Sequence, residues 1–311
     1  MKIRTAIIGC GDVVQSYGNN SESMLNHLAA LEQNKNYEII GISDTDESKL
    51  KSARERYKIK NSYNSYKDLI LENEIDLVIV AVPTSLHYEV IKFLIDHEIS
   101  DIFCEKPLTN SLKEIKNINE SLANQNIYVN YFRRWNEELE REAGKVQEGT
   151  YGKFIKGNCY YTKDLYTNGS HILHILNWFL GNPDSVKTRY LNQCNNEIFA
   201  DFTLNFNDSP ININCLEDVD YVLIELDLIF TKGRIKIMQR GQKLVIGQVI
   251  RDENYDFNKI AEHEINTKWN ECFSNAYKNI EECIIGKKVN KCDINSALQV
   301  HKILDDIKNE K

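Results

Sequence analysis

The fold class is decided by the stretch Asp101-Ile102-Phe103-Cys104-Glu105-Lys106-Pro107-Leu108. Its apolar start predicts a buried strand, and Pro107 ends that strand because proline has a fixed φ and no N–H to donate to a sheet. Glu105 and Lys106 are therefore expected at the carboxyl end of a strand, where open α/β sheets bind ligands. A lysine in such a position can transfer a proton. An exposed lysine that pairs with Glu105 is the alternative.

A glycine-rich turn follows the first apolar run of the chain. Ile3–Ile8 leads directly into Gly9-Cys10-Gly11-Asp12-Val13-Val14. In a dinucleotide-binding turn the first glycine permits the tight bend, and the second lets the backbone approach a pyrophosphate at a helix N-terminus. Val14 stands where that fingerprint has its third glycine or alanine. An ordinary strand–helix turn is the alternative.

The second strand is expected to end at Asp44, and an acid at this position suits the hydroxyls of an adenosine ribose. The two following residues, Thr45 and Asp46, offer nothing to a 2′-phosphate, so the sequence favours NAD over NADP. Asp44 lies 33 positions after Gly11, whereas the fingerprint expects about 20. We attribute the excess to an insertion around residues 18–23. Asp44 could also cap the helix that follows it.

Strands and helices alternate in this half of the chain. The run Asp76–Val82 is the clearest strand, because a continuous Val/Ile run fits a parallel strand that is covered on both faces. Pro83 stops it, and helix signals follow with His87 in the first turn. The expected strands are Ile3–Ile8, Tyr37–Ile42, Asp76–Val82 and Ile102–Cys104. Their alternation with helices predicts a doubly wound parallel sheet.

The motifs of the chain, taken in order, resemble one known family. They are Gly9-x-Gly11, Val82-Pro83-Thr84-x-x-His87, Glu105-Lys106-Pro107 and the segments 130–136, 149–153, 168–181 and 293–298. Together they resemble the glucose–fructose oxidoreductase/inositol dehydrogenase (Gfo/Idh/MocA) family of oxidoreductases. The resemblance implies an α/β protein with an N-terminal Rossmann domain, residues 1–125. It also implies a C-terminal α+β domain for substrate binding and oligomerisation, residues 126–311, with a large, mainly antiparallel sheet.

The same resemblance implies a nicotinamide cofactor and a set of residues around it. The expected cofactor-binding residues are Gly9, Gly11, Asp12, Val13, Asp44, Val82, Pro83, Thr84, His87, Glu105, Lys106 and Arg134. His87 could instead be an ordinary first-turn residue. Arg133, Arg134 and Trp135 could instead form a solvated or packed turn.

The second half of the chain shows strand patterns of its own. Short polar turns separate the runs Phe154–Tyr161, Ser185–Asn192, Phe199–Phe206, Ile211–Cys215, Tyr221–Phe230, Arg234–Met238 and Lys243–Ile250. Helices are expected over Glu271–Ile285 and Ile294–Lys308, with Asp293 as the cap of the second. A sheet of this size with one exposed face often forms subunit contacts, so we expect a homo-oligomer, a dimer or a tetramer.

Lys106 and His171 are the expected catalytic pair. Lys106 would exchange a proton with the oxygen of a sugar or cyclitol while hydride moves between its carbon and the nicotinamide. His171 is suited to a proton relay. Family members carry an acid four residues before this histidine, where the chain has Thr167, and many carry Asp three residues after it, where the chain has His174.

Several polar residues near His171 are candidates for substrate binding. These are Lys106, Tyr160, Lys163, Asn168, His171 and His174. His171 and His174 lie three apart on one helix face, so they could also be hydrogen-bonded core histidines or, less favourably, a metal pair. We expect no metal site.

Composition limits the partners. The 311 residues are 42% hydrophobic and 27% charged, as in a soluble globular protein. The net charge, 38 − 46 = −8, argues against nucleic acid and anionic membranes as partners. No apolar run approaches the roughly 20 residues of a membrane span, and the N-terminus has no signal-peptide pattern. Eight scattered cysteines without a Cys-x-x-Cys pair fit free thiols in a cytoplasmic protein.

The sequence thus predicts an NAD-dependent oxidoreductase acting on the hydroxyl or keto carbon of a sugar, sugar nucleotide or cyclitol. The second hypothesis is a dinucleotide-binding sensor or regulatory protein on the same fold without turnover, which Val14 and Thr167 keep open. A third hypothesis is a protein that binds a ligand other than a nucleotide. It would require the match of Gly9, Gly11 and Asp44 to the dinucleotide fingerprint to be a coincidence.

Overall fold

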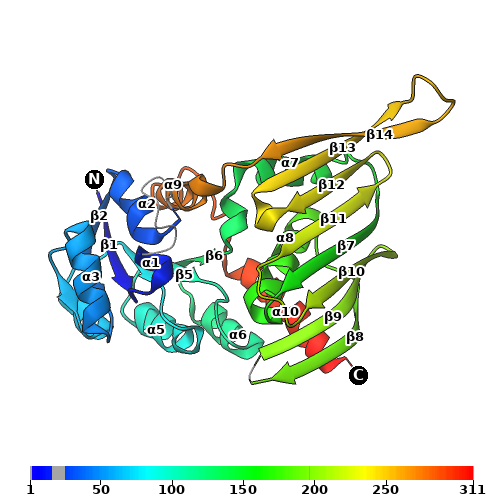
Figure 1. The fold of residues 1–311 in the computed structure, drawn as a ribbon. Helices are drawn as coiled ribbons and strands as arrows, with labels where there is room; N and C mark the ends of the chain where they lie inside the picture. The colour runs from blue at the N-terminus through cyan, green and yellow to red at the C-terminus, as the bar shows by residue number, and fades with distance from the viewer. Residues whose placement is uncertain (1, 16–24, 196, 311) are drawn as a thin grey trace. The chain divides into compact units, whose positions relative to one another are not determined.

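The computed structural model describes residues 2–15, 25–195 and 197–310, and it divides into two compact units (Figure 1). The first unit consists of Met1–Trp135 and Asn270–Leu298, and the second of Asn136–Trp269 and Gln299–Lys311. The expected boundary at residue 125 therefore differs from the observed division in two places. The first unit continues to Trp135, and it takes a later segment of the chain as well. The proposed insertion at residues 18–23 lies outside the described residues.

A six-stranded parallel sheet forms the centre of the first unit. Its strand order is β3-β2-β1-β4-β5-β6. The strands are β1 (Ile3–Ile8), β2 (Tyr37–Ser43), β3 (Ser62–Tyr63), β4 (Leu77–Val80), β5 (Asp101–Glu105) and β6 (Asn126–Asn130). This order is that of a Rossmann fold, in which strands are added to one side of β1 up to β3 and to its other side from β4 onward. The predicted doubly wound parallel sheet is confirmed.

Helices connect these strands and shield the sheet from water. They are α1 (Asp12–Gln15), α2 (His27–Gln33), α3 (Glu47–Tyr57), α4 (Tyr66–Leu71), α5 (Thr84–Asp96), α6 (Leu112–Ser121) and the 3-10 turn η1 (Phe132–Trp135). The four side chains of Leu77–Val80 are fully buried, as a strand covered on both faces requires. The later helix α9 (Cys272–Ile284) also belongs to this unit, where Tyr37 of β2 donates a hydrogen bond of 2.6 Å to the carbonyl of Tyr277.

The second unit contains an eight-stranded sheet with the order β14-β13-β12-β11-β7-β10-β9-β8. The strands are β7 (Phe154–Thr162), β8 (Ser185–Cys194), β9 (Glu197–Phe206), β10 (Ser209–Leu216), β11 (Ile224–Phe230), β12 (Gly233–Met238), β13 (Lys243–Arg251) and β14 (Asn258–Asn266). Among the described ladders of this second sheet, only β7–β10 is parallel, and the others are antiparallel. The predicted large, mainly antiparallel sheet is confirmed, and β14 is an addition to the strands we expected.

One face of this sheet is buried and the other is partly open. Along β9 and β11, buried and half-buried residues alternate strictly, so every second side chain points into the core. The helices α7 (Glu137–Gln147) and α8 (Ser170–Leu180) lie on the buried side, and a π-helical turn, η2 (Leu165–Gly169), leads into α8 (Figure 1). The hairpin β13–β14 extends beyond β12. The pairing of β13 with β12 ends at Gln248, whereas its pairing with β14 continues to Arg251.

The remaining elements are short, except for the last helix. They are η3 (Gln239–Gly241), η4 (Trp269–Glu271) and α10 (Ile294–Asn309). Asp293 accepts a hydrogen bond of 3.1 Å from the backbone N–H of Ser296, so it caps α10 as predicted. All eight cysteines are free. No helix within the described ranges is long and apolar enough to cross a membrane.

Candidate cofactor site and catalytic lysine

The glycine turn after β1 is shaped by close contact with the end of β4. Gly9 has a φ of +98°, and a Cβ at this position would lie 2.4 Å from the carbonyl oxygen of Ala81. Only glycine is compatible with both the angle and this approach. At Gly11, by contrast, a Cβ would meet no atom within 4 Å. The backbone of the second glycine therefore borders open space, as close approach of a phosphate would require.

Asp44 ties the end of β2 to this turn. One carboxylate oxygen accepts a hydrogen bond of 2.7 Å from the backbone N–H of Cys10, and the other accepts one of 2.9 Å from the N–H of Asp46. The helix α3 is capped by Asp46, whose side chain accepts from the N–H groups of Ser48 and Lys49. The alternative role of Asp44 as the helix cap was therefore wrong. Asp46, two residues further along the chain, is the N-cap of α3 instead.

A pocket of about 700 Å³ opens beside these residues. Five of the predicted cofactor residues line it: Gly9, Gly11, Asp44, Val82 and Pro83. They come from the carboxyl ends of β1, β2 and β4, on both sides of the point where the strand order reverses, which is where ligands bind in this fold. The residues present, with a glycine that leaves open space and an acid beside it, fit the pyrophosphate and ribose of a dinucleotide.

Sequence reasoning missed the other wall of this pocket. Asn64, Ser65, Tyr66 and Lys67, around the start of α4, line it together with Lys49 of α3. No spacing rule marks these residues, because they reach the pocket only through the fold. Of the other predicted cofactor residues, Asp12 and Val13 lie in α1 and Thr84 opens α5.

The end of β5 carries Glu105 and is followed directly by Lys106, as predicted. Both residues are half-buried, and the peptide bond from Lys106 to Pro107 is cis. Since β4 and β5 are parallel neighbours, Lys106 emerges from the same edge of the sheet as the pocket residues Val82 and Pro83.

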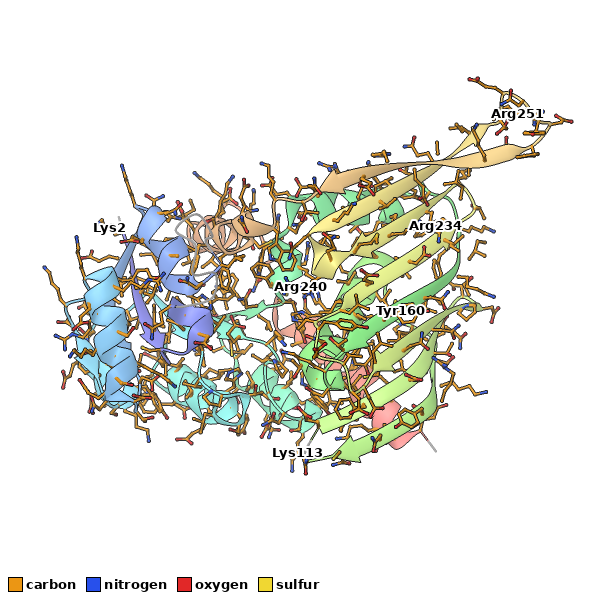
Figure 2. The ribbon with its side chains drawn as sticks, in the orientation of Figure 1. Lys2, Lys113, Tyr160, Arg234, Arg240 and Arg251 are labelled. Carbon is orange, nitrogen blue, oxygen red and sulfur yellow. The ribbon has the colours of Figure 1, made fainter. Side chains whose placement is uncertain are left out.

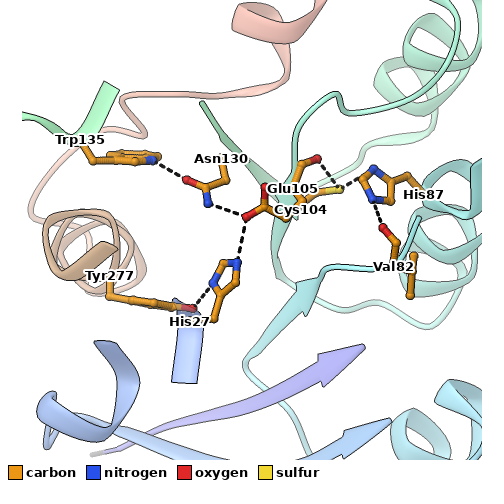
Figure 3. Close-up of polar contacts among 8 residues, drawn as sticks. All are labelled: His27, Val82, His87, Cys104, Glu105, Asn130, Trp135 and Tyr277. Atoms are coloured by element: carbon orange, nitrogen blue, oxygen red, sulfur yellow. Dashed lines mark hydrogen bonds and ion pairs between the residues drawn. The ribbon is translucent and has the colours of Figure 1, made fainter. Parts of the chain in front are cut away.

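Glu105 is fixed by two hydrogen bonds (Figure 3). Its Oε1 accepts from the side-chain amide of Asn130 at 2.6 Å and lies 3.0 Å from Nε2 of His27. Burial by itself raises the pKa of Glu105, but the hydrogen bonds from His27 and Asn130 and the charge of Lys106 outweigh it, and the pKa is lowered. Glu105 is therefore a carboxylate at neutral pH. Trp135 completes this side by donating to the Asn130 carbonyl oxygen at 3.0 Å.

His87 supports the other side of the same turn. Its Nε2 lies 2.9 Å from the carbonyl oxygen of Val82, and its Nδ1 lies 3.0 Å from that of Pro107 and 3.4 Å from the sulfur of Cys104. Burial lowers the pKa of His87. The ring thus links the segment after β4 with the segment after β5. Figure 3 shows the contacts of the ring with Val82 and Cys104. Its nitrogens contact protein groups, although we expected His87 among the cofactor contacts.

Arg134 and Trp135 lie in η1. Arg134 donates from Nε to the carbonyl oxygen of Lys291 at 3.0 Å, and Trp135 is only 3% exposed. The ring of Trp135 makes an edge contact with Phe103, 6.3 Å between centroids. These contacts are those of the packed turn that we considered as the alternative.

In the second unit, the predicted residues lie on and before α8. Asn168 is buried and donates to the carbonyl of Thr162 at 2.8 Å. His171 and His174 are 8% and 4% exposed, and the ring of His174 lies 6.5 Å from that of Trp178. Among the described residues, no group of three His, Cys, Asp or Glu side chains is arranged to hold a metal ion.

Tyr160 and Lys163 are placed differently. Tyr161 is buried against the π-helical turn, where its ring lies 3.4 Å from a Cβ built on Gly169. Because successive side chains of a strand alternate between faces, Tyr160 points to the opposite, open face of the sheet, where it is 43% exposed (Figure 2). Lys163 is exposed just after β7. Tyr160 therefore does not share a face with Asn168.

Comparison with known proteins points to one family for the first part of the chain. Residues 3–131 match the model of an oxidoreductase family with an NAD-binding Rossmann fold, GFO_IDH_MocA. Over these residues the chain is similar to this family. The Gfo/Idh/MocA resemblance seen in the sequence is confirmed.

The curated relatives are distant and match only in part. An uncharacterized oxidoreductase, YrbE, of Bacillus subtilis is 28% identical over 153 residues, which are 49% of this chain and 42% of that protein. Myo-inositol 2-dehydrogenase of Thermotoga maritima is 26% identical over 117 residues, 37% of this chain and 35% of that enzyme. The chain thus matches less than half the length of these two relatives.

Solved structures extend the likeness of fold to the whole chain. The WlbA dehydrogenase of Bordetella pertussis, in complex with NADH and UDP-GlcNAcA, has a TM-score of 0.79 at 17% identity and covers 99% of this chain and 95% of its own. A mutant of Gal80p of Saccharomyces cerevisiae has a TM-score of 0.80 at 14% identity, with 100% and 96% covered. At such identities the comparison shows the fold of both units.

Proposed function

We propose that the protein is an NAD(H)-dependent oxidoreductase that acts on a hydroxyl or keto carbon of a sugar, sugar nucleotide or cyclitol. The observation that carries this proposal is the arrangement at one sheet edge. The pocket at Gly9, Gly11 and Asp44 lies at the carboxyl ends of β1, β2 and β4, and the adjacent strand β5 ends in the carboxylate of Glu105 and the amine of Lys106.

The proposed chemistry divides between cofactor and protein. A bound nicotinamide accepts or supplies the hydride. In oxidation the substrate oxygen loses a proton as its carbon loses hydride, and Lys106 takes up that proton; in reduction Lys106 returns it. His171 is the second proton-transfer residue in this proposal. Glu105, a carboxylate beside Lys106, stabilises the protonated amine.

NAD is the proposed cofactor rather than NADP. Asp44 lines the pocket, and its carboxylate would accept hydrogen bonds from ribose hydroxyls but repel a 2′-phosphate. Two lysines, Lys49 and Lys67, line the same pocket and reduce that repulsion. We therefore expect the protein to bind NAD(H) more tightly than NADP(H), without excluding NADP(H) completely.

A polyhydroxylated substrate is supported by the relatives. Besides myo-inositol 2-dehydrogenase, the D-apiose dehydrogenase of Rhizobium rhizogenes is 23% identical over 210 residues, 60% of this chain and 57% of that enzyme. Both names describe dehydrogenases of polyhydroxylated compounds. We propose that Lys163, Asn168 and His174 contribute to binding such a substrate, with Tyr160 the weaker candidate because it lies on the other face of the sheet.

The first experiment titrates NADH and NADPH separately by fluorescence. It then tests NAD-dependent turnover of myo-inositol, D-apiose, D-xylose and UDP-GlcNAcA. We expect tighter binding of NADH, turnover of at least one compound, and loss of turnover in Lys106→Met with NADH binding retained. Lys113→Met, at an exposed lysine of α6, is the matched control (Figure 2). Turnover by Lys106→Met at the rate of the control would refute the assigned role of Lys106.

A sensor without turnover is the second candidate. Thr167, in place of the family's acid before His171, favours it. Binding of NADH without turnover of any compound in the panel would move this candidate to first place. Failure to bind either nucleotide would refute both proposals.

We also propose that the protein is a homo-oligomer whose contacts include the second unit. Large apolar side chains are exposed on its strands and on the hairpin: Ile155, Tyr160, Tyr190, Leu191, Val249, Ile250, Tyr255, Phe257 and Ile260. Figure 2 shows Arg251 near the tip of that hairpin, beyond the other strands. Exposed apolar side chains of this size, spread over β7, β8 and the hairpin, are typical of contact surfaces. Sedimentation equilibrium would give the mass, and a monomer at micromolar concentration would refute the proposal.

A further inference from the structure

His27 of α2 is buried beneath the catalytic turn and contacts only protein groups in the described part of the chain. It is 1% exposed, and three aromatic rings surround its imidazole at near-perpendicular angles: Phe103 at 5.4 Å, Phe273 at 4.8 Å and Tyr277 at 6.0 Å. This packing fixes the ring and denies it access to a ligand. Any influence on chemistry must pass through its two nitrogens.

Each nitrogen has one hydrogen-bonding partner. Nδ1 lies 2.6 Å from the hydroxyl of Tyr277, and Nε2 lies 3.0 Å from Oε1 of Glu105 (Figure 3). The three residues, His27, Tyr277 and Glu105, come from three elements: α2, α9 and β5, respectively. The main-chain carbonyl of Tyr277, remote from its hydroxyl, accepts a separate hydrogen bond from Tyr37.

The direction of these bonds follows from proton accounting. Burial raises the pKa of the Tyr277 hydroxyl well above its usual value, so the hydroxyl keeps its proton. Within the described residues its hydrogen-bonding partner is Nδ1 of His27, so it donates there. Nδ1 is then an acceptor, and the ring carries its proton on Nε2 and donates to the Glu105 carboxylate. A doubly protonated ring would leave the buried hydroxyl of Tyr277 without an acceptor.

We propose that His27 is a positioning residue for Lys106: the relay Tyr277–His27–Glu105 fixes the carboxylate of Glu105, and with it the peptide and amine of the next residue. The inference rests on the proposed role of Lys106. Both donors to Glu105, His27 and Asn130, meet the same oxygen, Oε1. Without His27 the carboxylate would have one donor and freedom to turn, and the negative charge beside Lys106 would shift.

Within the part of the chain that the structure describes, few titratable groups face His27, which makes the test interpretable. Glu105 faces it from β5 and Tyr277 from α9, and Tyr37 of β2 lies behind Tyr277. Three variants probe the relay. His27→Leu removes both bonds, His27→Gln retains an N–H donor for Glu105, and Tyr277→Phe removes only a hydroxyl and leaves the ring. Tyr37→Phe is the matched control, because it removes a hydroxyl of the same cluster that touches neither His27 nor Glu105.

The kinetic test uses the panel compound that the wild-type protein turns over. We expect His27→Leu to lower kcat about 10- to 100-fold, since misplacement by about an ångström costs this much. NADH affinity should stay within about threefold, and the pH dependence of kcat should shift. Tyr277→Phe should shift in the same direction by less, and His27→Gln should recover most of the loss. Tyr37→Phe should lower stability without moving the pH profile.

A second readout does not depend on turnover. In ¹⁵N spectra of histidine-labelled protein at pH 7, His27 should show the Nε2–H tautomer, and Tyr277→Phe should disturb its Nδ1 signal. Wild-type kcat and pH profile in His27→Leu, where Lys106→Met is inactive, would overturn the inference. So would a doubly protonated or Nδ1–H ring. Turnover by Lys106→Met at the rate of its control would instead refute the assigned role of Lys106, and the fixed position of Glu105 would then be judged by the spectra alone.

Discussion

The two glycines of the turn after β1 should respond differently to substitution by alanine: Gly9→Ala should lower stability, and Gly11→Ala should lower the affinity for NADH. In Gly9→Ala the new Cβ would lie 2.4 Å from the oxygen and 2.7 Å from the carbon of the Ala81 carbonyl, both main-chain atoms that cannot rotate away. The φ of +98° adds strain of about 1–3 kcal/mol for a residue with a Cβ. Overpacking adds about 1–3 kcal/mol. The first unit should therefore lose roughly 2–6 kcal/mol of stability.

Gly11→Ala supplies the matched comparison. Its Cβ would meet no protein atom within 4 Å, so stability should change by no more than about 0.5 kcal/mol. The same methyl group would occupy the space that we assign to the pyrophosphate. We expect NADH affinity to fall about tenfold or more, which corresponds to at least about 1.4 kcal/mol.

Hydrogen exchange followed by mass spectrometry separates these effects, because it reports the opening free energy of β1 and β4 without assuming that both units unfold together. A fluorescence titration gives the affinity for NADH. If Gly9→Ala exchanged as slowly as the wild-type protein, the argument from the Ala81 contact would be refuted. If Gly11→Ala bound NADH as tightly as the wild-type protein, the pyrophosphate would not lie at this turn.

Three further substitutions test other parts of the structure. Asp44→Ala should reduce the ratio of NADPH to NADH dissociation constants about tenfold, and fluorescence titrations would show an unchanged ratio if another group selects the cofactor. Because burial lowers the pKa of His87, the unfolded chain binds its proton first, so this contribution to stability is present above about pH 6.5 and is lost as pH falls through the lower folded pKa. His87→Gln should flatten the fall of the urea midpoint between pH 7 and 5, and an equal slope would contradict this. Ile250→Ser with Phe257→Ser should lower the mass found by sedimentation equilibrium, whereas an unchanged mass would remove the hairpin from the interface.

The first sheet could be predicted because its signals are local. Four of its strands, β1, β2, β4 and β5, are mainly apolar runs followed within three residues by glycine, aspartate or proline, and Leu77–Val80 is buried on both faces as such a run should be. The strand β6, which Tyr131 follows, has no such stop and was not among the strands we expected. The turn residues Gly9 and Gly11 follow β1 immediately, so chemistry and position were visible together. Five of the predicted cofactor residues line one pocket because they all stand at or just after strand ends.

The hairpin shows where such signals fail. The strand β14 has the sequence of Asn258–Asn266, with only two large apolar residues, Ile260 and Ile265, and almost all of it is exposed. A strand whose two faces both meet solvent carries no hydrophobic alternation, so periodicity gives no signal. The two-residue strand β3 is too short for any pattern.

The support of Glu105 shows a second kind of limit, which concerns pairing rather than pattern. The apolar spacing of Phe273, Ala276, Tyr277 and Ile280 predicts a helix with one buried face, and the structure confirms that all four side chains are buried. A tyrosine on such a face requires a buried partner for its hydroxyl, but the sequence pattern predicted only the helix and no partner for Tyr277. It could not name His27, which is 250 positions earlier in the chain. Because the boundary was expected at residue 125, α9 was assigned to the other domain, although its Tyr277 contacts His27 within the first unit. If the relay acts as we propose, substitutions on this face of α9 should therefore alter the pH dependence of turnover without touching the cofactor pocket.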